Sequence, residues 1–171
     1  MRCVGLLTDV TAPFGVPEPD PDGYIDEAPR TCNTVWELLP FEGDIFHAKY
    51  ARNEVYTFLE PPTVDPGMEN PTITPIPGDV CYIPFTAGQL PGNTYGYRSD
   101  EAAAGEDRVV DIALFYGRNN LLLNGDIGFV PANVFAAVEE NLAAMAEACN
   151  DVWRRGSYGE RLVFRRIDDG P

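Results

Sequence analysis

The spacing of apolar side chains predicts two helices in this chain. Over residues 29–39, apolar residues recur every three or four positions, which places them on one face of a helix. Pro29 suits the first turn of this helix, and Pro40 ends it. A second apolar stripe with the same spacing runs over residues 132–155, and Gly156 follows it as a natural C-terminal cap. We therefore expect a short early helix and a long late one, each with one buried face.

The other apolar segments are short or alternate with polar residues, and they predict strands. The expected strands cover residues 2–7, 44–50, 54–59, 79–85, 109–116, 126–130 and 161–167. Stretches rich in proline, glycine or charge predict long loops near residues 10–25, 60–78 and 86–108. Many strands with only two helices favour a mainly β fold over an alternating α/β sheet. The length of 171 residues predicts a single domain over residues 1–171.

Alternation within residues 44–50 gives this strand an expected register and a candidate site. It places Phe46 and Tyr50 on the core face and His47 and Lys49 together on the outer face. His47 is the only histidine and Lys49 the only lysine in the sequence. An imidazole exchanges protons near neutral pH, and an ammonium group stabilises an oxyanion, so both residues are catalytic or ligand-binding candidates. The alternative interpretation is the solvated outer face of a hairpin.

Further candidates for a polar groove lie on neighbouring predicted elements. Tyr56 lies on the strand that forms a hairpin with residues 44–50. Glu69 and Asn70 lie in the irregular segment before the strand that carries Tyr82, where they either bind a polar ligand or cap a turn. Three residues later in the chain are candidates for the apolar floor of the groove and for a group that binds an anion. The alternative interpretation is that the two aromatic residues among them are part of the hydrophobic core. These later candidates are Phe115, Tyr116 and Arg118.

Charge and motif content exclude several classes of function. The net charge of −15 argues against binding to nucleic acid and to anionic membranes. The sequence shows neither a signal peptide nor a membrane span, so a cytoplasmic protein is expected. The four cysteines are widely spaced and predict buried, reduced thiols. With one histidine and no phosphate-binding or nucleophile motif, we expect no metal site and no cofactor, and we leave a homo-oligomer open.

The order of several motifs resembles a known family. Residues 28–41, which run from an Ala-Pro-Arg-Thr start to the end of the first predicted helix, resemble the corresponding helix of cyclophilins, and residues 43–50 continue the match. With residues 69–84 and 112–118, the chain resembles the bacterial cyclophilin-like family named domain of unknown function 3830. This resemblance implies a cyclophilin-like closed β-barrel of about eight strands that is capped by helices.

The resemblance implies no established reaction. In prolyl isomerases of the cyclophilin fold, a Phe-His-Arg sequence supplies the arginine that polarises the prolyl amide, whereas here Phe46 and His47 are followed by Ala48. One alternative is therefore a degenerate peptidyl-prolyl isomerase. Another is an amide- or lactam-processing enzyme that uses His47 and Lys49, by analogy with hydrolases on related barrels. The leading hypothesis is a module that binds a small molecule or short peptide in a groove on the barrel wall.

Overall fold

The computed structural model describes residues 2–7, 10–15, 27–86, 89–90, 108–138 and 140–166, the first two ranges by their backbone alone. The helices are α1 (Pro29–Leu38) and α3 (Leu142–Arg155). The strands are β1 (Arg2–Leu7), β2 (Val10–Gly15), β3 (Phe41–Asp44), β4 (Phe46–His47), β5 (Glu54–Leu59), β6 (Pro71–Thr72), β7 (Asp79–Thr86), β8 (Arg108–Phe115), β9 (Leu123–Asn124), β10 (Gly128–Phe129), β11 (Ala132–Val138) and β12 (Arg161–Arg166). The fold is therefore mainly β with two helices, as predicted.

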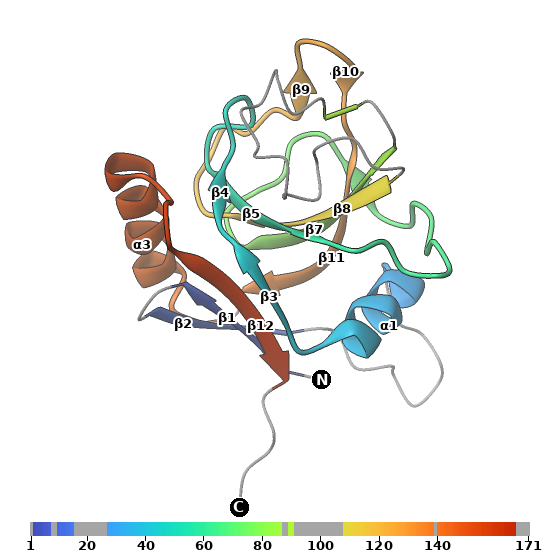
Figure 1. Ribbon diagram of the computed structural model, residues 1–171, viewed down its shortest axis with the longest axis horizontal. Coiled ribbons are helices and arrows are strands. Elements are labelled where there is room, and N and C mark those ends of the chain that lie inside the picture. The colour runs from blue at the N-terminus through green and yellow to red at the C-terminus, as the bar shows by residue number, and fades with distance from the viewer. Residues whose placement is uncertain are drawn as a thin grey trace, which may run out of the picture.

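One large antiparallel sheet organises the described part of the chain. Its order is β3-β12-β1-β2-β11-β7-β8-β5-β4, and β6 adds a short pairing to β11, which makes ten strands. β9 and β10 form a separate two-stranded hairpin. In Figure 1 the sheet curves strongly, with α3 beside β12 on the left and α1 at the lower right. The two helices thus lie at different sides of one curved sheet.

The expectation of a closed barrel is wrong. A closed barrel needs two partners for every strand, but β3 pairs only with β12 and β4 pairs only with β5 in the described part of the chain. The chain changes partners at Ile45, whose amide donates to the carbonyl of Glu160 at 3.2 Å. The strand expected over residues 44–50 is therefore split, and its two parts are the two ends of an open sheet.

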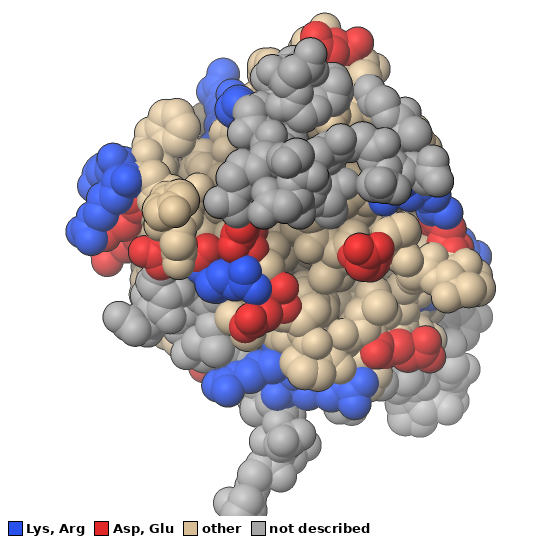
Figure 2. All heavy atoms as spheres, in the orientation of Figure 1, with Lys and Arg blue, Asp and Glu red and all other residues tan. Residues whose placement is uncertain are grey.

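Ion pairs reinforce the end of the sheet formed by β3 and β12. The Arg161 guanidinium donates to Asp44 at 2.8 Å and to Glu42 at 3.1 Å. Figure 2 shows acidic side chains beside basic ones over the middle of this face. Because these groups are exposed, each such pair adds at most about 1 kcal/mol to stability.

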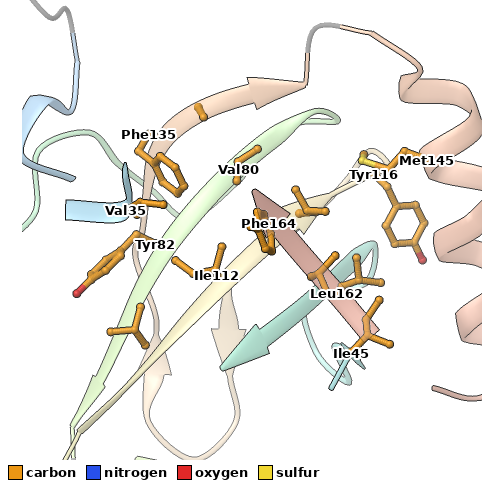
Figure 3. Close-up of a cluster of buried hydrophobic side chains, with 14 of the residues drawn as sticks. Val35, Ile45, Val80, Tyr82, Ile112, Tyr116, Phe135, Met145, Leu162 and Phe164 are labelled. Carbon is orange, nitrogen blue, oxygen red and sulfur yellow. The ribbon is translucent and has the colours of Figure 1, made fainter. Parts of the chain in front are cut away.

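The main core fills the concave side of the sheet and takes one face of each helix. Figure 3 shows Val80, Ile112 and Phe164 converging from different strands in this core. α1 contributes Cys32 and Val35, and α3 contributes Met145, Cys149 and Val152. The buried faces predicted from the apolar spacing are confirmed for both helices. The three cysteines whose side chains are described, Cys32, Cys81 and Cys149, are free and buried.

The long late helix is only half confirmed. Residues 132–138 form β11, which pairs with β7 and with β2, and the helix begins at Leu142. Asn141 precedes the helix with φ 59°, a left-handed conformation that turns the chain between the two elements. Hydrogen bonds to two neighbouring strands therefore outweigh the helical spacing of Val134 and Val138.

The remaining expectations are met unevenly. The strands expected at both ends of the chain and over residues 54–59, 79–85 and 109–116 are confirmed. β2 occupies part of the expected loop near residues 10–25, and the strand expected over residues 126–130 is largely a turn, with only Gly128–Phe129 paired. Most of the expected loop near residues 86–108 lies outside the described residues. Neither described helix has the length and apolarity needed to cross a membrane.

Candidate functional site

A cavity of about 430 Å³ opens at the β4–β5 end of the sheet. Its walls come from residues 46–51, from β5, β7 and β8, from residues 122–124, and from residues 152–157 at the C-terminal end of α3. These segments are far apart in the sequence, and the strand order brings them together. The cavity is therefore a product of the tertiary structure.

The strand register decides which side chains form the cavity floor. On β5, Glu54, Tyr56 and Phe58 share one face, and their partners on β8 are Phe115, Ala113 and Asp111. This face carries a second, separate hydrophobic cluster that includes Ile83, Phe85 and Leu122. The side chains of the opposite face, such as Val55 and Ile112, lie in the main core. The sheet is thus buried on both faces, and the cavity belongs to the second face.

Aromatic rings form one wall of the cavity. Phe46 stacks against Tyr56 with ring centroids 5.5 Å apart and also contacts Phe58 at 5.4 Å. Trp153 and Tyr50 stand at the opening, 63% and 49% exposed. An apolar or aromatic ligand body would find flat, half-exposed partners here.

The expected register of residues 44–50 is reversed. Ile45 lies in the main core and is 1% exposed, whereas Phe46 pairs with Tyr56 on the cavity side. His47 pairs with Val55 and so points to the same side as the main core. The pairing of β4 with β5 therefore sets Ile45 and His47 on the side of the main core, whereas Lys49 and Tyr50 lie beyond β4 and are exposed.

His47 lies at the cavity edge, and its ring nitrogens are both engaged. Nδ1 lies 3.1 Å from the carbonyl oxygen of Ala48, which only accepts, so Nδ1 carries the proton. Nε2 lies 2.6 Å from the Tyr116 hydroxyl and accepts from it in the neutral ring. The His47 ring also packs on Trp153 at 4.8 Å. Burial lowers the pKa of His47, against a smaller opposite effect of the Ala48 carbonyl, and this favours the neutral ring.

Two buried carboxyl groups in the cavity are absent from the sequence-based candidates. Glu54 and Asp111 line the cavity, and each is only 4% exposed. Burial raises the pKa of Glu54 to about 8. Burial, and then the charge of Glu54, raise the pKa of Asp111 well above its ordinary value. The signal available in the sequence was an acid in the middle of an otherwise apolar strand, residues 109–116.

The predicted site residues divide into two groups. His47, Lys49 and Tyr56 line the cavity together with Ala48. The other six are not among the residues that line it. Phe115 is buried in the second cluster, and Tyr82 and Tyr116 lie in the main core. Arg118 is exposed, and its carbonyl accepts a hydrogen bond from Asn53 at 2.8 Å.

Glu69 and Asn70 anchor the start of α1. The Glu69 carboxylate accepts from the Thr31 amide at 2.8 Å, from its hydroxyl at 2.9 Å and from the Arg30 amide at 3.2 Å. Although burial opposes the shift, these hydrogen bonds lower the pKa of Glu69. Asn70 donates to the Val134 carbonyl at 3.2 Å. Glu69 therefore caps the first turn of α1 and not a turn within its own segment.

Asn133 completes the same network from the buried interior. Its side-chain oxygen accepts from the amides of Glu69 and Asn70 at 3.1 and 2.7 Å. Its amide nitrogen donates to the Thr31 hydroxyl at 2.6 Å and to the Gly67 carbonyl at 3.2 Å. This residue is fully buried, and it ties the irregular segment before β7 to α1. Sequence patterns gave no sign of it.

Among the described residues, no group of three or more His, Cys, Asp or Glu side chains gathers in a way that could hold a metal ion. What the cavity offers chemically is an apolar and aromatic enclosure, two acids with raised pKa values and a lysine at its edge.

Comparison with known proteins gives a family and a fold. The family model described as "Protein of unknown function (DUF3830)" matches residues 22–164. The solved "Structure of McbB in complex with tryptophan" is similar with a TM-score of 0.57 and 14% sequence identity, and the match covers 99% of this chain and 46% of that chain. This chain thus spans about half the length of McbB, and the likeness concerns the fold alone. No curated protein matches this sequence.

Proposed function

The chain belongs to the protein family of unknown function DUF3830, and we propose that it binds a small organic molecule in the cavity between β5 and the end of α3. The observation that carries this proposal is the cavity itself. Its volume of about 430 Å³ falls within the range of roughly 300–1,000 Å³ that is typical of small-molecule sites. Its lining is mostly apolar and aromatic with a few polar groups, which is also typical of such sites.

The arrangement of polar groups supports an oriented ligand. The aromatic wall of Phe46 and Tyr56 suits the flat or apolar body of a ligand. Glu54 and Asp111 lie on the floor, and Lys49 lies at the edge. A ligand with one apolar part and one polar part would therefore be held in one direction.

Titrations with simple aromatic probes test this function. Phenethylamine, phenylethanol and phenylacetate would each be added at millimolar concentration and followed by amide-resolved NMR. We expect at least one probe to shift the signals of residues 46–56 and 152–157. Absence of such shifts with all three probes would overturn the proposal.

A matched pair of variants localises the binding. Ser157→Phe fills the cavity from its edge, whereas Thr63→Phe adds the same ring at an exposed position outside it. The first change should abolish the shifts, and the second should leave them unchanged. Equal binding by both variants would place the probes elsewhere and would also overturn the proposal.

A second candidate is an amide- or lactam-processing enzyme. It is favoured by one observation: burial raises the pKa of Glu54 to about 8, so a proton donor lines the cavity at neutral pH. Protonation of a departing amine needs such a group within reach of the bound substrate. A panel of amides and lactams would be tested for turnover with the wild type, Glu54→Gln and His47→Ala. Turnover that the Glu54 change removes would support the enzyme, and no turnover with the wild type would exclude it for these substrates.

A further inference from the structure

The carboxyl group of Asp111 lacks part of its hydrogen bonding. Its Oδ1 atom is buried and has no hydrogen-bond partner in the described part of the chain. Asp111 lines the cavity and is only 4% exposed. Buried polar atoms in native proteins nearly always have a partner, and an orphaned one calls for an explanation such as a bound group. Because Asp111 lies in the cavity wall, a ligand bound in the cavity can supply the missing partner.

Glu54 adds a second acid to the same cavity. On β8, Asp111 lies four residues before Phe115, the partner of Glu54, so the two positions are about 13 Å apart along the strand at ~3.3 Å per residue. Ala113 lies between them on the shared face, with Cys81 as its neighbour on β7. Tyr56, the partner of Ala113 on β5, also lies between the two acids, so its ring forms the floor of the cavity between them.

The electrostatics of this floor favour a positive charge. None of the ion pairs within the described residues involves Glu54 or Asp111. The charge of Glu54 helps to raise the pKa of Asp111, so each acid makes ionisation of the other more costly. A cation in the cavity reverses that effect, because a nearby positive charge stabilises ionised carboxylates. The net charge of −15 draws cations toward the protein from a distance.

We propose that the cavity selects an organic cation, an amine or amidine whose charged nitrogen donates to the unpartnered oxygen of Asp111 while its apolar body lies on Phe46 and Tyr56, and that Glu54 attracts the same charge from a longer distance. This inference rests on the proposed function and names the class of ligand. The organic body is part of it because the walls are aromatic and aliphatic. Since no group of His, Cys, Asp or Glu side chains in the described part of the chain is placed to hold a metal ion, the two acids suit such a nitrogen better than a bare metal ion.

The three probes already named test the charge of the ligand, because they share a phenyl ring and differ in the polar group. We expect the wild type at about 0.15 M salt to bind phenethylamine about tenfold more tightly than phenylethanol, with phenylacetate weakest. Equal affinities, or tighter binding of the alcohol or the acid, would overturn the inference while leaving the proposed function in place. If no probe binds, the proposed function fails and the inference fails with it.

Isosteric variants assign the preference to the two acids. Asp111→Asn and Glu54→Gln keep the shape of each side chain and remove its ability to ionise next to a bound cation. We expect each to reduce the preference for the amine over the alcohol to roughly threefold or less, with the affinity for the alcohol retained. Glu37→Gln, which removes an exposed acid from α1, should leave the preference unchanged. A preference that survives in both cavity variants would reflect the overall charge of the protein and would overturn the inference.

Discussion

Replacing Glu54 with glutamine should stabilise the folded protein at neutral pH. It should also remove most of the loss of stability that Glu54 causes as the pH rises from about 4.5 to about 8. The ordinary pKa of a glutamate is 4.5, and burial raises that of Glu54 to about 8. At pH 7 the carboxyl group is therefore protonated in the folded state and ionised in the unfolded state. Since the unfolded state binds fewer protons, stability falls as the pH rises from about 4.5 to about 8.

The size of the effect follows from the same shift. The ordinary pKa of 4.5 lies about two and a half units below pH 7, and each unit corresponds to about 1.4 kcal/mol of unfolding free energy. Glu54 therefore costs about 3 kcal/mol at pH 7, a large share of the roughly 5–15 kcal/mol that stabilise a typical domain. Glutamine has nearly the same shape, and it does not ionise.

Urea unfolding over a series of pH values measures this effect. The difference in unfolding free energy between Glu54→Gln and the wild type should be near zero or unfavourable at about pH 4, and should grow by about 3 kcal/mol by pH 7. Glu37→Gln is the control, because this exposed side chain keeps its contact with water. A difference that stays constant with pH would refute the assignment of a protonated, buried Glu54.

Three further changes test the structure at other places. Asn133→Ala should destabilise the fold by about 2–4 kcal/mol, measured by urea unfolding, because it removes four hydrogen bonds from a buried side chain. Tyr116→Phe should raise the pKa of His47 in an NMR titration, because the neutral ring loses the hydroxyl that donates to Nε2. Gly43→Ala should lower the thermal midpoint and cost about 1–3 kcal/mol, because its new methyl group would collide with the buried hydroxyl of Thr57.

Each of these changes has a control, which is the same type of substitution at a position that lacks the corresponding contact. Asn150→Ala removes a single hydrogen bond within α3, Tyr158→Phe alters an exposed ring, and Gly125→Ala adds a methyl group with no atom within 4 Å. If a control has the same effect as its partner, the contact described here is not the cause.

Much of the local structure was predictable from the sequence. The buried faces of both helices follow from their apolar spacing, since three- and four-residue repeats need only the geometry of the helix itself. The strand over residues 109–116 was likewise predicted from its own residues, and it corresponds to β8. The family was also identified, because it depends on the order of motifs.

The candidate site was only partly predictable. Three of the predicted residues line the cavity, namely His47, Lys49 and Tyr56. The register of the strand that carries His47 is, however, the opposite of the one that alternation predicted. Neither Glu54 nor Asp111 was among the candidates predicted from the sequence. Their common cavity depends on β5 and β8 being paired in one particular register, which neither segment specifies alone.

The sequence by itself thus determined the types of most elements and the faces that they bury, because these depend on contacts between residues a few positions apart. The tertiary structure alone decided three things: that residues 132–138 join a sheet, that the chain changes strand partners at Ile45, and that the sheet stays open. Each of these depends on hydrogen bonds between residues far apart in the chain. Their free energy outweighs local preferences of a few tenths of a kcal/mol per residue.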